Sequence, residues 1–197
     1  MRKLYLSILI YFFALNVFSQ SKEAVQYNDK LVSFSSPIIE NINSLNTQLL
    51  ELTLKKEHNL LIESEIEDFL LLKNNLNVKI NIAIDSIYNM DVFDQKMKLK
   101  ECVFNRLLNY RNMIDNDYPE LISVLLLDTN VNNNIIINSE IKILDLTLRI
   151  IEIEKNSSKV QSDFADKYNF QLVNKGNTNW ELKEQQVREI KSQLLIK

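Results

Sequence analysis

The stretch from Leu60 to Met90, LLIESEIEDFLLLKNNLNVKINIAIDSIYNM, decides the fold. Along it, positions separated alternately by four and three residues are apolar with one exception: Ile62, Ile66, Phe69, Lys73, Leu76, Ile80, Ala83 and Ile87. This spacing places side chains along one face of an α-helix. Because an apolar face of this length must be buried against other segments, the stretch predicts a long amphipathic helix within a bundle.

Part of the same stretch also carries the alternating pattern of a β-strand. Apolar residues recur at every second position across 78–84, and a similar alternation crosses 146–150. An α+β fold that pairs these two runs is therefore the structural alternative. The helix is favoured because the four-and-three spacing continues over about 25 residues, which is longer than an ordinary strand, and no turn residue divides it.

Other segments show the same helical spacing and can share one apolar interior. The long ones are 21–56, 94–127 and 135–168, and a shorter one follows at 179–195. Lys175-Gly176-Asn177 is the glycine-marked turn before the last segment, and a single Gly in 197 residues leaves few positions for the turns of a β fold. The prediction is all-α: an antiparallel up-down bundle of four main helices with a short fifth helix at the C-terminus.

Two prolines and two aspartates define the expected breaks. Pro37 either bends the first helix or divides it into two pieces, and Pro119 does the same within 94–127. Asp94 is predicted to cap the start of that segment, and Asp117 to cap the piece that contains Pro119.

The segment 135–168 carries two adjacent apolar stripes, which indicates a helix buried on more than one side. One stripe consists of Ile137, Ile141, Leu144, Leu148 and Ile151, and the other of Ile143, Leu146, Ile150, Ile153, Val160 and Phe164. Two such stripes need neighbours on two faces of the helix.

The first twenty residues, MRKLYLSILIYFFALNVFSQ, have the pattern of a secretory signal peptide. Arg2 and Lys3 precede an apolar run to about Phe18, and Val17 and Ser19 are the small residues before a cleavage site. Residues 1–19 are thus expected to be removed, which leaves 20–197 as one helical-bundle domain outside the cytoplasm, in the periplasm or at the cell surface. A retained anchor is the alternative, although the run is shorter than the roughly 20 residues of a membrane span.

Charge argues against nucleic acid as a partner. The net charge of the chain is −3, and loss of Arg2 and Lys3 with the leader makes it −5. The basic residues are interspersed with acidic ones instead of forming a patch, so a phosphate backbone is poorly matched. No stable membrane span is expected after cleavage.

His58 is the only histidine and Cys102 the only cysteine, and these single residues rule out several kinds of site. One histidine cannot supply a ferritin-like di-iron site or an ordinary catalytic zinc site, so His58 is interpreted as a surface residue at a helix boundary. One cysteine cannot form an internal disulfide, and Cys102 is expected to pack as a small apolar residue, with a nucleophile or an intermolecular disulfide as alternatives.

Two further candidates are also interpreted as structural. Lys73 interrupts the central apolar face, where its stem can pack while its ammonium group reaches water; a buried pair with an acid is the alternative. Asp128, Asn130 and Asn132 have the first spacings of a calcium loop, but Asn133 replaces the required Gly and Ser139 the final Glu. No metal, cofactor or catalytic residue is predicted.

Three stretches give the chain a resemblance to a known group. They are AVQYND at 24–29, LKECVFNRLLNYRNMIDNDYPELISVL at 99–125 and VQSDFADKYNF at 160–170, all after the leader. With them, the chain is similar to small exported helical-bundle surface proteins of bacteria with two membranes. That group has no established activity or ligand, and many of its members are lipoproteins, whereas no cysteine follows the leader here. The resemblance assigns no functional residue.

These observations predict a non-enzymatic envelope or surface protein. Long helices offer broad faces for another protein, and the expected partner is another envelope protein. The alternative is a protein that binds an apolar small molecule or lipid in the bundle core. Catalysis is not expected, because the predicted core faces hold almost no polar side chains apart from Lys73.

Overall fold

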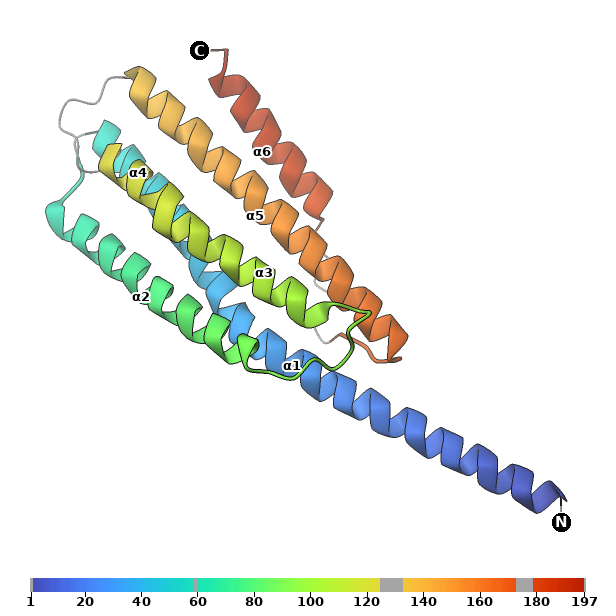
Figure 1. Cartoon of the computed structure of the whole chain (residues 1–197). Helices are drawn as coiled ribbons and strands as arrows, with labels where there is room; N and C mark the ends of the chain where they lie inside the picture. Colours follow the sequence, from blue (N-terminus) through green and yellow to red (C-terminus); the bar gives the residue numbers. More distant parts are fainter. Residues whose placement is uncertain (1, 59, 125–132, 173–178, 197) are drawn as a thin grey trace.

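The computed structural model describes residues 2–58, 60–124, 133–172 and 179–196, with side chains from Ser21 onward (Figure 1). All secondary structure in these residues is helical: α1 (Arg2–Glu57), α2 (Glu63–Tyr88), α3 (Leu99–Asn112), the π-helical turn η1 (Met113–Asp117), α4 (Tyr118–Ile122), α5 (Asn133–Lys167) and α6 (Trp180–Leu194). The predicted all-α class is confirmed for this part of the chain. The α+β alternative is wrong, because 78–84 lies within α2 and 146–150 within α5.

The long helices pack side by side as a helical bundle (Figure 1). α1 contacts α2, α3 and α5. α3 also contacts both α2 and α5, and α6 packs against α5. The N-terminal part of α1, in dark blue, extends beyond the other helices. Among the described residues, no helix is both long enough and apolar enough to cross a membrane.

The apolar face that decides the fold is buried as predicted along most of α2. Its buried members are Phe69, Leu76, Ile80, Ala83 and Ile87. Lys73 is only half-buried on this face. The predicted start of the helix at Leu60 is wrong, since Ile62 is 59% exposed and occupies the N-cap in an extended conformation. Its N–H donates to the Glu65 carboxylate at 3.4 Å, which satisfies one donor at the helix start.

The two prolines behave differently. α1 continues through Pro37 as one helix, so of the two predicted outcomes the division into separate pieces does not occur. Pro119 lies in the first turn of α4, directly after the π-helical turn η1. A proline has no N–H and its ring crowds the carbonyl of the preceding turn, and a wider π turn relieves that crowding without ending the helical path.

Neither predicted aspartate cap forms. Asp117 occupies the N-cap position of α4 without a capping hydrogen bond, and its carboxylate instead pairs with Arg149 at 3.0 Å. α3 begins at Leu99 and not near Asp94, and its N-cap is Lys98, which adopts a left-handed conformation with φ of 52°. For Asp117, a side-chain partner on another helix replaces the local cap. For Asp94, the corner between α2 and α3 is longer than predicted, so the helix starts several residues after it.

The corner between α2 and α3 is fastened to the end of α5. The Asp94 carboxylate accepts hydrogen bonds from the Lys96 N–H at 2.9 Å and the Tyr168 hydroxyl at 2.7 Å, and it also pairs with Lys167. Phe93 packs nearby against Tyr168, with ring centroids 5.3 Å apart. These contacts hold the pocket described below.

Candidate functional site: a buried polar cluster and two pockets

A polar cluster lies inside the bundle where α1, α3 and α5 meet. Arg106 Nη1 lies 3.4 Å from Glu154 Oε2, and both side chains are only 10% exposed. Arg106 Nη2 donates to the Ser35 hydroxyl at 2.6 Å, and the Tyr110 hydroxyl donates to the other oxygen of Glu154. We call Ser35, Arg106, Tyr110 and Glu154 the polar cluster. Its members come from three helices, so it links α1, α3 and α5 through polar contacts.

Burial determines what the tyrosines in this region can do. Burial raises the pKa of the Tyr110 hydroxyl far above its ordinary value, and the negative charge of Glu154 raises it further. Burial likewise raises the pKa of Tyr118, whose hydroxyl donates to Asn46. Both hydroxyls are therefore neutral donors at neutral pH and cannot serve as bases.

The polar cluster corrects the expectation that the core is almost wholly aliphatic or aromatic. Sequence reasoning identified neither Arg106 nor Glu154 as a core residue. A signal was present for Glu154: Ile150, Glu154 and Ser157 are spaced by four and three residues on one helical face, and both polar residues are buried. Nothing local distinguishes Arg106 from a surface arginine.

A groove of about 240 Å³ lies beside the polar cluster, between α3 and α5. Cys102, Arg106 and Ser157 contribute to its walls, together with Asn105, Asn109 and Asn156. The Cys102 thiol donates to the Ser157 hydroxyl across 3.7 Å and is partly exposed, so Cys102 makes a polar contact in addition to the apolar packing that the sequence predicted. The Arg106 Nε–H has no hydrogen-bond partner among the described residues.

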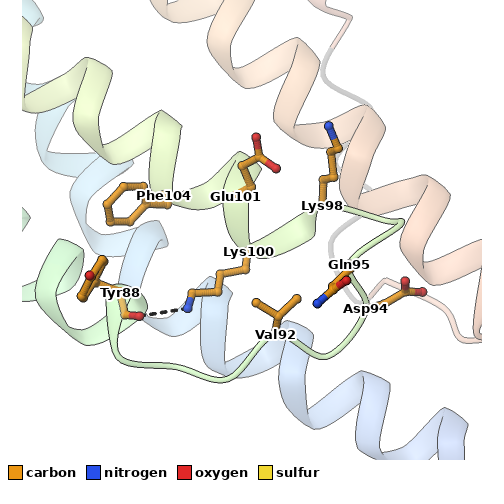
Figure 2. A pocket seen from close by; sticks show the side chains of 8 residues that line it. All are labelled: Tyr88, Val92, Asp94, Gln95, Lys98, Lys100, Glu101 and Phe104. Atoms are coloured by element: carbon orange, nitrogen blue, oxygen red, sulfur yellow. Dashed lines mark hydrogen bonds between the residues drawn. The ribbon is translucent and has the colours of Figure 1, made fainter.

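A larger pocket, of about 380 Å³, lies at the corner between α2 and α3 (Figure 2). Its walls combine apolar and charged side chains: Tyr88, Val92, Asp94, Gln95, Lys98, Lys100, Glu101 and Phe104. Lys100 Nζ donates to the Tyr88 carbonyl at 2.9 Å and also to the Met90 carbonyl, which satisfies the end of α2. The mixture suits a small amphipathic molecule better than a purely apolar one.

The other sequence candidates do not converge on these pockets. His58 is exposed in the turn after α1. Lys73 forms no ion pair within the described residues, so the alternative of a buried pair is not seen there. Asp128, Asn130 and Asn132 of the calcium-like loop, and the Lys175-Gly176-Asn177 turn, lie outside the described residues. Within 2–58, 60–124, 133–172 and 179–196, no three His, Cys, Asp or Glu side chains gather as metal ligands would.

Comparison with known proteins found no match: no family model, curated protein or solved structure matches the chain.

Proposed function

We propose that the chain is an exported envelope or surface protein of the bacterial type, which acts without catalysis through contact with another envelope protein. The observation that carries the proposal is the leader at Met1–Gln20, with its basic start, apolar run and small residues before the cut. The extension of α1 beyond the other helices is compatible with removal of that leader, since the bundle does not enclose it (Figure 1).

The polar groups argue for a structural role and against a catalytic one. In the polar cluster, the two terminal nitrogens of Arg106 and both oxygens of Glu154 are occupied by each other and by two hydroxyls, which leaves only the Arg106 Nε–H without a partner among the described residues. A catalytic base needs a protonatable group that reaches a substrate, whereas Tyr110 and Tyr118 are buried donors. The cluster instead stabilises a unique alignment of α1, α3 and α5.

We further propose the finer architecture, an antiparallel up-down four-helix bundle with a short fifth helix. Support comes from the order of partners between the helices. From Cys102 through Arg106 to Glu120 the residue numbers rise, while those of their α5 partners fall from Ser157 through Glu154 to Lys142. Between α1 and the α3–α4 segment the numbers rise together, as in Ser35 with Arg106 and Asn46 with Tyr118. Distances between spin labels placed on such pairs test this arrangement.

Export and partner capture test the main proposal. The full chain with a C-terminal tag is produced in a bacterium with two membranes, and we expect an extracytoplasmic product that begins near Gln20. Affinity capture with residues 20–197 as bait then recovers a defined envelope protein. A full-length product that stays in the cytoplasm rejects export, and co-purification of one small ligand without any protein rejects the contact role.

The corner pocket favours a second candidate, binding of a small amphipathic molecule. The sequence alternative placed an apolar ligand in the bundle core, whereas this cavity lies at the α2–α3 corner and includes Lys98 and Glu101 (Figure 2). Native mass spectrometry of the mature chain distinguishes the candidates. A retained ligand that is lost after Phe104→Glu supports ligand binding.

A further inference from the structure

α6 rests on one side of the bundle only. None of its side chains is buried: Trp180, Val187 and Leu194 are each partly exposed, and Ile190 is 49% exposed. Within the described residues, α6 packs against α5 and makes no comparable contact with another helix. A helix attached through one neighbour and without a buried side chain belongs to the least stable part of a fold.

Two ion pairs show which face of α5 lies beneath α6. Lys155 Nζ lies 3.0 Å from Glu181 Oε1, and Asp145 pairs with Lys191. Because Asp145, Leu148 and Lys155 are separated by three and seven residues, they share one face of α5. Leu148 therefore lies between the two ion pairs and faces α6.

Two further apolar residues flank Leu148 on the same side of α5. Leu144 and Ile151 are 9% and 5% exposed, yet neither belongs to the main apolar core. Together, Leu144, Leu148 and Ile151, with Asp145 and Lys155 at their ends, form what we call the outer stripe of α5. This is part of the first of the two apolar stripes that the sequence predicted, and α6 is the neighbour that it requires.

The ion pairs orient α6 more than they hold it. Lys155 and Glu181 have side chains that are 46% and 73% exposed, and exposed ion pairs contribute little to stability. They do set a direction: the acidic residue of α6 lies at the Lys155 end of the outer stripe, and the basic residue at the Asp145 end. Glu181 and Lys191 are separated by about 15 Å along a helix.

We propose that the outer stripe of α5 is the helix-docking surface of this protein and that α6 occupies it until a partner helix displaces α6. The partner is a protein segment that forms an amphipathic helix, with an acid opposite Lys155, a base opposite Asp145 and apolar residues between them. This inference rests on the proposed contact function and specifies its surface. α6 thereby lowers the apparent affinity for the partner, because a tethered helix competes at high effective concentration.

A labelled synthetic peptide of residues 179–196 is the probe, and the full mature chain is the receptor. Val187→Asp in the chain places a charge on the inner face of α6, while the matched control, Gln186→Asp, places the same charge on an exposed position of the same helix. We expect the Val187→Asp chain to bind the peptide at least about tenfold more tightly than the control, because the competing helix is weakened. Equal binding to both chains, or none to either, overturns the proposal.

Charge reversal tests the direction of docking. In the Val187→Asp chain, Lys155→Glu should weaken binding of the peptide, and a peptide with Glu181→Lys should recover most of the loss. Reversal at Lys79, an exposed residue of α2, is the control and should change nothing. If the Val187→Asp chain does not fold, Glu181→Lys combined with Lys191→Glu places like charges opposite Lys155 and Asp145, which weakens the docking of α6 without altering its apolar residues. A peptide insensitive to Lys155 overturns the assigned surface, whereas export and partner capture are measured separately and test the proposed function.

Discussion

At the scale of single residues, Glu154 has the largest expected effect, because it compensates a buried guanidinium group. Replacing Glu154 by Ala leaves Arg106 without its counter-charge inside the bundle and removes the acceptor of Tyr110. Loss of one member of a buried pair costs about 3–5 kcal/mol. We expect a loss of that size in the free energy of unfolding, measured by urea denaturation.

Exposed and paired substitutions provide the controls for this prediction. Glu152→Ala, on the exposed side of the same helix, should change stability by less than about 0.5 kcal/mol. Arg106→Met combined with Glu154→Leu should cost less than Glu154→Ala alone, since both charges are then absent. If the double variant loses as much free energy of unfolding as the two single variants added together, the two residues are not coupled.

Asp94 gives the protein a predictable dependence on acid. Its hydrogen bonds from Lys167 and Tyr168 hold its pKa well below the ordinary value of 3.8 in the folded state. A lowered folded-state pKa contributes stability that is present above about pH 4 and is lost as the pH falls below it. Asp94→Asn should therefore destabilise the protein at pH 7 by about 1–2 kcal/mol, and this difference should shrink below pH 4. Asp91→Asn, at an exposed position in the same corner, is the control; a difference independent of pH would contradict the mechanism.

At the scale of elements, the two prolines should differ in their effect on stability. Pro37 lies deep inside α1 and removes one hydrogen bond of that helix, whereas Pro119 directly follows the π-helical turn η1, whose wider turn relieves the crowding by its ring. Pro37→Ala should raise the free energy of unfolding by about 1–3 kcal/mol, and Pro119→Ala by less. Thermal unfolding of both variants gives the comparison, and an equal effect of the two would contradict it.

The sequence predicts the helices better than it predicts their contacts. The apolar spacing from Phe69 to Ile87 identifies the buried face of α2, because that pattern depends on neighbours within one helix. The partners of Asp94 and Asp117 lie more than 30 residues away, at Tyr168 and Arg149, so a local capping rule assigns them wrongly. Tertiary hydrogen bonds replace local ones at both sites.

The same distinction applies to the candidate sites. A four-and-three spacing marks Glu154 as lying on an inner face, but its pairing with Arg106 depends on how α3 is aligned with α5. The corner pocket depends on a ten-residue connection, 89–98, whose path follows from contacts with α5. The spacing of apolar residues along one helix says nothing about how α3 aligns with α5 or about the path of residues 89–98. For this reason sequence reasoning identified neither site.

At the scale of the whole molecule, the described buried side chains begin at Ala24, and the helix before that point extends past the bundle (Figure 1). Removal of residues 1–19 should therefore leave the folded core intact, whereas a deeper truncation should remove part of it. Chains that begin at Gln20 and at Glu23 should be equally helical by circular dichroism and should unfold with free energies within about 0.5 kcal/mol of each other.

A chain that begins at Val32 should differ sharply from both. It lacks Ala24, Asn28 and Leu31, which are 0%, 4% and 1% exposed, and it loses the hydrogen bond from Gln161 to Asn28 at 2.9 Å. Loss of a buried Leu side chain alone costs about 2–5 kcal/mol, so we expect a decrease of at least that size. Urea denaturation of the three chains measures it. Equal stability of the chains that begin at Glu23 and Val32 would mean that residues 23–31 of α1 do not pack in solution. A deficit confined to the Val32 chain places the start of the folded unit between Glu23 and Val32.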